Sequence, residues 1–143
     1  MTVGRAIIPT GDGTRRCGRV PDGDAGSGKA VMRRFLHVGV ITDQVQPGEI
    51  DAAETKVHVT NPADHPYRVE YLRFEPDSPL TGPVRDQPHM AFAVDDLEAE
   101  IAWEQVLLGP FRAMEGLRVA FILRDGAVFE FMRFDATSAY DAR

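Results

Sequence analysis

Two of the four histidines and two of the glutamates in this chain form a repeated pair whose side chains could bind one metal ion. The order histidine then glutamate appears first as His37 and Glu70, and again as His89 and Glu130. Neutral imidazole and carboxylate groups are ligands that divalent first-row metals accept in proteins. Burying four ionisable side chains together is costly unless a cation compensates them. We therefore predict that these four residues bind one divalent metal ion, with zinc, nickel, cobalt, manganese and iron as the candidates.

The segments that carry these residues resemble each other. EYLRFE at residues 70–75 is nearly repeated as EFMRFD at residues 130–135, and LHVGVITD at residues 36–43 is similar to PHMAFAVD at residues 88–95. Self-similarity of this kind is a sign of duplicated structural units. A single histidine or glutamate on a strand most often has a structural or solvent-facing role, but a repeat that keeps both is hard to explain by exposure alone. One alternative stays open, in which the duplication is real but the metal has been lost and a binding module remains.

Strand alternation predicts how each histidine is presented. In HMAFAV, residues 89–94, the histidine and the two alanines share one face, and the bulky residues share the other. We expect the bulky face to pack on the short helix that follows, with Trp103 packed after it, and the small face to line a cavity.

In the first copy, the Pro-Gly pair at residues 47–48 leaves room for little more than one helical turn. Each copy is thus expected to contain a strand, a short helix and about three strands, with a hairpin turn at Asp125 and Gly126 in the second copy.

The domain is expected to occupy residues 31–137 of the 143. Residues 1–30 are rich in Gly, Arg and Asp and nearly free of large apolar residues, so we predict a disordered tail there. Residues 138–143 are expected to form a C-terminal tail. Met32 stands directly before the first strand, and we hypothesise that it is the native start of the protein.

Composition narrows the possible partners and the compartment. The net charge is −6, so no broad basic surface for nucleic acid or an anionic membrane is expected. No apolar run reaches the roughly 20 residues that a membrane-spanning helix needs. Cys17 is the single cysteine, which excludes an intrachain disulfide. We therefore expect a cytoplasmic protein whose partner is a small-molecule substrate.

The chain resembles the vicinal oxygen chelate superfamily, which includes glyoxalase I, extradiol dioxygenases, methylmalonyl-CoA epimerase, fosfomycin-resistance thiol transferases and bleomycin-sequestering proteins. MRRFLHVGVIT at residues 32–42 is similar to the opening strand of that family, and PHMAFAVDDLEAEI at residues 88–101 to the start of its second unit. DGAVFEFMRF at residues 125–134 is similar to its terminal strand. The resemblance covers about residues 33–135, and its second-unit motif is the more specific.

The fold that this resemblance implies is of the α+β class. Two paired βαβββ modules would form a cupped mixed sheet around a metal, with module one at residues 33–80, module two at residues 86–135 and a shortened helix in module one. Family members usually dimerise, so the resemblance also implies a homodimer.

The ligand set that the resemblance implies is the one already singled out. His37, His89 and Glu130 match the common three ligands, and Glu70 matches the fourth position, where glyoxalase I also has a carboxylate. This implies a metal-dependent lyase or isomerase of a small oxygenated carbonyl metabolite. The metal would polarise a substrate oxygen, and Glu70 or Glu130 would shuttle a proton on the adjacent carbon.

Two other functions remain as alternatives, and three further residues are candidates for the cavity. An iron-dependent extradiol-type dioxygenase needs only the three common ligands, and a non-catalytic drug- or metabolite-binding protein could use the same cup. The first helix is shorter than in glyoxalase I and no glutathione-binding arginine pattern is present, so a small substrate other than a glutathione adduct is expected. His58 is a candidate substrate contact, and Phe74 and Phe134 share the faces of the two glutamates and are expected to form apolar walls.

Overall fold

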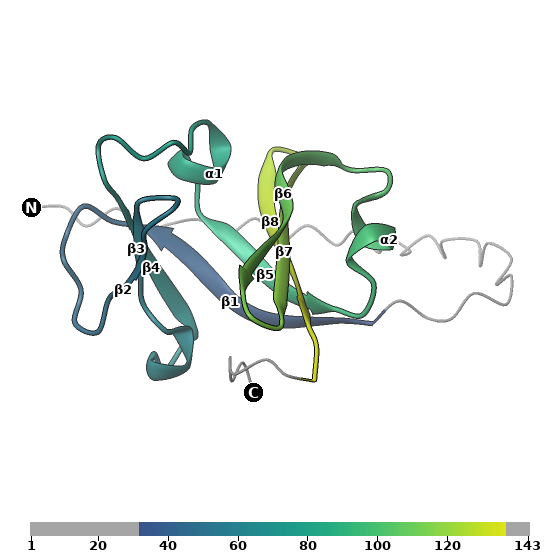
Figure 1. Cartoon of the computed structure of the whole chain (residues 1–143), viewed down its shortest axis with the longest axis horizontal. Coiled ribbons are helices and arrows are strands. Elements are labelled where there is room, and N and C mark those ends of the chain that lie inside the picture. Colours follow the sequence, from purple (N-terminus) through teal and green to yellow (C-terminus); the bar gives the residue numbers. More distant parts are fainter. Residues whose placement is uncertain (1–31, 137–143) are drawn as a thin grey trace, which may run out of the picture.

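The computed structural model describes residues 32–136, which form one curled mixed sheet with few helices (Figure 1). Its strands are β1 (Arg33–Ile41), β2 (Ile50–Ala52), β3 (Val57–Val59), β4 (Val69–Phe74), β5 (His89–Val94), β6 (Gln105–Met114), β7 (Leu117–Arg124) and β8 (Ala127–Phe134). The helical segments are η1 (Pro62–Asp64), α1 (Pro83–Asp86) and α2 (Leu97–Ile101). The domain boundaries expected at residues 31 and 137 and the two expected tails lie outside this described range, and the hypothesis that Met32 is the native start stays a prediction.

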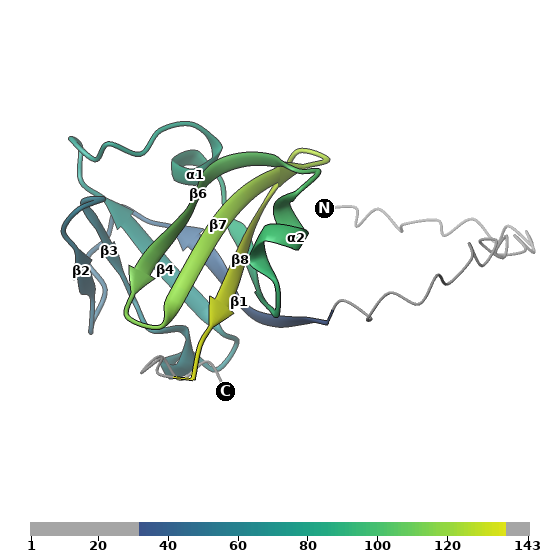
Figure 2. The same cartoon turned by 45° about the vertical axis from the view of Figure 1, so that its right-hand side comes forward.

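The strand order is β2-β3-β4-β1-β5-β8-β7-β6, so β1 and β5 lie at the centre of the sheet. These two strands pair antiparallel, whereas β1 with β4 and β5 with β8 pair parallel. The sheet curls into a half-barrel, which is compatible with the expected α+β class. Figure 2 shows α2 beside β6–β8, on the side away from β2–β4.

Two apolar clusters hold the second half of the sheet in place. Asp96 caps α2 by accepting a hydrogen bond from the Ala99 backbone N–H at 3.0 Å. The convex-side cluster packs Leu97 of this helix against the sheet, and its buried members are Val94, Leu97, Ala120, Ile122 and Phe131. The concave-side cluster forms the floor of the cup, and its buried members are Leu36, Val84, Ala91, Leu117, Val119, Phe121, Val128 and Met132. The bulky face of β5 therefore packs on the helix, as strand alternation predicts.

The hairpin expected at Asp125 and Gly126 is confirmed. Both residues have positive φ, 52° and 78°, which is the backbone of a type I′ turn between antiparallel β7 and β8. Because this turn type matches the right-handed twist of the strands, a two-residue Asp-Gly loop is enough to close the hairpin.

The short helix expected in the first half is not formed, which corrects that prediction. Residues 42–49 make bends and turns between β1 and β2. The carboxylate of Glu49 accepts a hydrogen bond from the Gln46 backbone N–H at 2.9 Å, and Gly48 takes φ of 75°. Pro47 has no N–H to donate to a helix, so local side-chain hydrogen bonds take the place of helical ones.

The expectation that Trp103 is packed is also wrong, because its side chain is 97% exposed. It lies in the turn after α2, whose core-facing side is already taken by Leu97 and Ile101. None of the helices within residues 32–136 has the length and apolarity needed to cross a membrane.

Candidate metal centre

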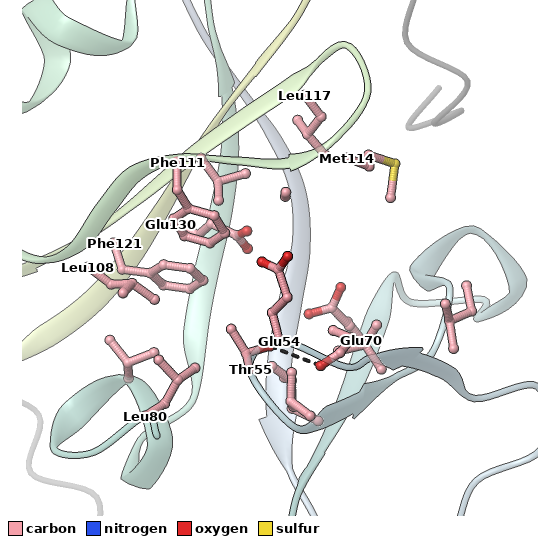
Figure 3. Close-up of a pocket in the computed structure, with 18 of the residues that line it drawn as sticks. Glu54, Thr55, Glu70, Leu80, Leu108, Phe111, Met114, Leu117, Phe121 and Glu130 are labelled. Carbon is pink, nitrogen blue, oxygen red and sulfur yellow. Dashed lines mark hydrogen bonds between the residues drawn. The ribbon is translucent and has the colours of Figure 1, made fainter. Parts of the chain in front are cut away.

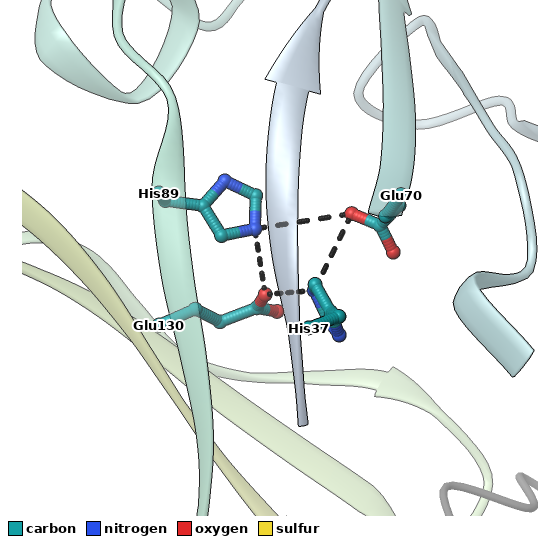
Figure 4. Close-up of side chains that lie close together, drawn as sticks. All are labelled: His37, Glu70, His89 and Glu130. Carbon is teal, nitrogen blue, oxygen red and sulfur yellow. Dashed lines mark ion pairs between the residues drawn. The ribbon is translucent and has the colours of Figure 1, made fainter. Parts of the chain in front are cut away.

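The four predicted ligands meet at the centre of the sheet (Figure 4). His37 comes from β1, Glu70 from β4, His89 from β5 and Glu130 from β8, which are the four central strands. One ligand atom from each residue lies within 4.8 Å of every other. Residues up to 93 positions apart in the chain are thus brought to one point, and this cluster could hold a metal ion.

Strand register explains why each glutamate lies beside its histidine. In the parallel β1–β4 pair, Glu70 stands opposite the residue two positions after His37. In the parallel β5–β8 pair, Glu130 stands opposite the residue two positions after His89. Because residues two apart share a face of the sheet, both pairs present their side chains to the concave side. The same offset in both halves places the four groups around one point.

The distances between the groups fit ligands around a single cation. Nε2 of His37 and of His89 lie 3.3 and 3.1 Å from Oε2 of Glu130, and 3.7 and 3.8 Å from Oε1 of Glu70. Atoms that sit ~2.1 Å from the centre of a tetrahedron are about 3.4 Å apart, from the usual metal–ligand lengths. The observed separations bracket that value.

The imidazole nitrogens are the strongest sign that these groups are ligands. His37 is 0% and His89 2% exposed, yet none of their four ring nitrogens has a hydrogen-bond partner among residues 32–136. Burying an unpaired polar atom costs about 1–3 kcal/mol, so native proteins keep few of them and each one needs a reason. A cation bound to Nε2 would supply that reason for one nitrogen of each ring.

Burial and mutual contacts shift the ionisation of the acids in opposite directions. Burial raises the pKa of Glu70 to about 7, with the neighbouring Glu130 adding to it and the imidazole of His37 opposing it. Burial also opposes ionisation of Glu130, but its contacts with His37 and His89 outweigh this and lower its pKa. For His37, burial favours the neutral ring, but Glu130 and Glu70 outweigh burial and raise its pKa. Glu70 therefore holds a proton close to neutral pH unless a cation displaces it.

Metal affinity is expected to rise with pH through about 7, because the Glu70 carboxyl and the His37 imidazole, whose pKa is also raised, must lose their protons before they can bind a cation. The metal-free fold has the opposite dependence: a carboxyl with a raised pKa stabilises it fully below its ordinary pKa of 4.5 and loses that contribution as the pH rises through 7. Zinc titrations by calorimetry between these limits, in two buffers of different ionisation enthalpy, would measure both the affinity and the proton release.

Glu70→Gln is the matched variant for this titration. It should bind zinc more weakly but with a shallower pH dependence, because the competing proton is gone. An affinity that is independent of pH in the unaltered protein would contradict the assigned role of Glu70.

The centre depends on a position without a side chain. Gly39 pairs with His89 across β1 and β5, and a Cβ atom built on Gly39 would lie 2.0 Å from Cε1 of the His89 ring. The ring therefore occupies the space that any other residue at position 39 would fill. Tight packing of this kind fixes the direction of the imidazole.

A cavity of about 510 Å³ opens beside the cluster (Figure 3). The two ligand glutamates, Glu70 and Glu130, form part of its wall. Most of the remaining wall is apolar and is contributed by both halves of the sheet and by α1; its larger members include Leu72, Phe74, Leu80, Val84, Leu108, Phe111, Phe121 and Met132. Mostly apolar walls with a few convergent polar groups are typical of small-molecule sites.

The three further candidates from the sequence fall in different places. Phe74 lines the cavity, as expected for its face of β4. Phe134 is not among the cavity-lining residues of the described chain and packs instead against the concave-side cluster.

The prediction for His58 is corrected by strand pairing. His58 stands opposite Arg73, while Val57 and Val59 stand opposite Phe74 and Leu72. Because Phe74 and Leu72 face the cavity, the two valines also line it and His58 faces away. Its Nε2 lies 2.9 Å from a carboxylate oxygen of Glu75.

Two acidic residues of the cavity wall, Asp51 and Glu54, were not predicted. Glu54 lies in the turn between β2 and β3, and its side chain points into the cavity (Figure 3). Alternation could not place it, because the side chains of turn residues follow no strand period. Leu80 and Val84, from the segment between the two halves, are cavity residues that were missed for the same reason.

The comparisons with known proteins support the fold alone. No protein-family model and no curated protein matches the sequence. The crystal structure of a hypothetical protein from Bacillus halodurans C-125 is similar, with a TM-score of 0.53 and 17% sequence identity. The match covers 74% of this chain and 97% of that chain.

Proposed function

We propose that this protein is a metal-dependent lyase or isomerase of a small carbonyl compound, of the vicinal oxygen chelate type. The observation that carries the proposal is the group of buried ring nitrogens of His37 and His89, which make no hydrogen bond within the described residues and face two carboxylates at the wall of an apolar cavity. Buried histidines normally have their hydrogen bonds satisfied, and a cation bound to Nε2 is the partner that this nitrogen of each ring lacks.

We also infer that the two halves of the sheet are copies of one βαβββ module, residues 33–80 and 86–135, with the helix lost from the first copy. The spatial orders β1-β4-β3-β2 and β5-β8-β7-β6 are equivalent, which supports this inference. The equal register offset between histidine and glutamate in both halves also supports it. A duplication accounts for the doubled EYLRFE-like segment and for one ligand pair from each half.

The residues divide the chemical work between holding the cation and shaping the substrate site. His37, His89, Glu70 and Glu130 would hold the ion, which when bound supplies Lewis-acid polarisation of a substrate oxygen. The apolar wall, including Phe74 and Phe121, excludes water and binds the hydrocarbon part of the substrate. A cavity carboxylate would then move the proton on the carbon beside the polarised oxygen. Glu70 as a fourth protein ligand favours this chemistry over that of a three-ligand dioxygenase.

Deuterium exchange into a carbonyl compound is the expected activity. Protein loaded in turn with zinc, nickel, cobalt or manganese should catalyse incorporation of deuterium from D₂O beside the carbonyl of 2-hydroxyacetophenone, followed by proton NMR. The apolar cavity wall predicts faster exchange with this aromatic ketone than with hydroxyacetone. Elemental analysis of the purified protein should find about one metal per chain.

Two results would redirect the assignment. Iron with consumption of O₂ would favour the dioxygenase, and a metal-free protein that binds hydrophobic ligands without exchange would favour a binding protein. Either result would overturn the proposal of a lyase or isomerase.

A further inference from the structure

We propose that Glu54, and neither of the two glutamates in the metal cluster, is the general base that accepts the substrate proton. This inference rests on the proposed function and assigns its proton-transfer step to a residue outside the cluster. Glu54 is an exposed residue in the turn between β2 and β3, and its side chain extends from the turn into the cavity in the direction of Glu70 and Glu130 (Figure 3).

The cluster leaves its own carboxylates poorly suited to this step. One oxygen of Glu70 and one of Glu130 belong to the group of ligand atoms that lie within 4.8 Å of one another. A cation bound there lowers the basicity of the carboxylates that hold it. Glu54 does not belong to that group, so its carboxylate would not be occupied in holding the ion.

Glu54 is also free to act. Within residues 32–136, its carboxylate makes no hydrogen bond or ion pair, whereas that of Glu49, just before β2, is held by two hydrogen bonds from Arg73 at 2.6 and 2.9 Å. A carboxylate that is already bound to an arginine is a poor proton acceptor, because the ion pair favours the charged form. The carboxylate of Glu54 is therefore available to a substrate in the cavity.

The turn that carries Glu54 is fixed at several points. The Thr55 backbone N–H donates to the Ala52 carbonyl at 3.2 Å, and the Thr55 carbonyl accepts from the hydroxyl of buried Ser78 at 2.6 Å. The next carbonyl, of Lys56, accepts from the Glu75 backbone N–H at 3.0 Å. A turn tied to the segment after β4 fixes the point from which the Glu54 side chain starts, so that its carboxylate needs only rotation about its own bonds to reach a substrate proton.

The step balances without any further reactant. The carbon beside the polarised carbonyl gives up a proton to a carboxylate oxygen of Glu54, and the electron pair of the broken C–H bond passes to the carbonyl oxygen as an enolate. The protonated Glu54 then returns a proton to carbon, and in D₂O it exchanges with solvent first, so deuterium enters the product.

The chain offers a matched control at the equivalent turn of the other half. Glu115 lies between β6 and β7, as Glu54 lies between β2 and β3, and both are exposed. Glu115 is not among the cavity-lining residues of the described chain. Glu54→Gln and Glu115→Gln thus make the same chemical change at corresponding turns, and of the two glutamates only Glu54 lines the cavity.

The test measures deuterium exchange into 2-hydroxyacetophenone by the zinc-loaded protein and both variants, with metal content determined for each. Glu54→Gln should lose about 10²- to 10⁴-fold in exchange rate, the usual contribution of a general base, and keep its zinc. Glu115→Gln should stay within about threefold of the unaltered protein by the same reasoning. Glu54→Asp, which keeps the carboxylate on a shorter arm, should recover part of the rate. Benzohydroxamate, which chelates zinc through two neighbouring oxygens, should bind Glu54→Gln and the unaltered protein equally well.

The outcomes separate the two proposals. Exchange in the unaltered protein that survives in Glu54→Gln would overturn the role of Glu54 and leave the proposed function standing. Loss of zinc or of benzohydroxamate binding in Glu54→Gln would also overturn it, because the residue would then act on the site rather than on the substrate. No exchange in the unaltered protein would overturn both.

Discussion

Replacing His89 with alanine is expected to abolish stoichiometric metal binding. The Nε2 atom of His89 faces both glutamates of the cluster and has no hydrogen-bond partner among the described residues, so the imidazole has no other evident role there. Loss of groups that only orient a ligand costs about 10- to 100-fold in metal affinity, and loss of a ligand itself should cost more. Zinc titrations followed by elemental analysis after gel filtration would measure the change.

The same variant has a clear signature in thermal stability. A metal at 100 times its dissociation constant stabilises the native state by about 2.7 kcal/mol, which corresponds to a rise of about 10–20 °C in Tm for a domain of this size. The unaltered protein should show this rise on addition of zinc, and His89→Ala should not. Differential scanning calorimetry with and without zinc would measure both.

His58→Ala is the matched control for His89→Ala. His58 lies on the face of β3 away from the cavity, and its contact is with Glu75. This variant should bind zinc and gain stability as the unaltered protein does. Equal zinc binding by the unaltered protein and His89→Ala would refute the proposed centre, even if both proteins fold normally.

Adding a single methyl group at Gly39 is expected to disrupt the centre almost as severely. The new Cβ would lie 2.0 Å from Cε1 of His89, a distance that requires the ring to move. Gly39 lies within β1 and has no positive φ, so alanine is compatible with its backbone and the conflict is purely steric. Overpacking of this kind costs about 1–3 kcal/mol. Because the ring carries a ligand atom, zinc affinity should fall by at least the 10- to 100-fold seen for misoriented ligands.

Gly126→Ala separates a general loss of stability from an effect on the metal. Gly126 has φ of 78° in the β7–β8 turn, and a Cβ atom there would meet nothing within 4 Å among the described residues. This variant should lose about 1–2 kcal/mol through backbone strain and keep its zinc affinity. Gly39→Ala should lose both stability and zinc affinity, as measured by chemical unfolding and by zinc titration. If both variants kept their zinc affinity, the close contact between Gly39 and His89 would have no role in the centre.

The repeat in the sequence identified the four groups, and strand periodicity placed them on faces of their strands. Residues two apart in a strand share a face whatever surrounds them, so His89 and Ala91 could be placed together before any pairing was known. The Asp125-Gly126 turn was equally predictable, because its conformation depends on two residues that tolerate positive φ. The repeated His-to-Glu order added the expectation of one shared site, and the four side chains do converge.

Alternation gives two faces to each strand but does not say which one is concave. His58 lies outside the cavity because β3 pairs with β4 in a register that places Val57 and Val59 beside the cavity-facing residues of β4. The helix expected after β1 does not form because local side-chain hydrogen bonds replace helical ones. Trp103 is exposed because Leu97 and Ile101 already fill the side of α2 that faces the core.

The sequence by itself determined which residue types stand at corresponding positions of the two similar segments, since strand period and turn chemistry act over a few residues. Only the tertiary structure decided which of those residues face one another, since pairing register and sheet curl join positions far apart in the chain. The close approach of Gly39 to His89 and the reach of Glu54 into the cavity both belong to this second kind. Neither could be predicted from the periodicity of the sequence, because the first depends on a contact between two strands and the second on the direction of a turn.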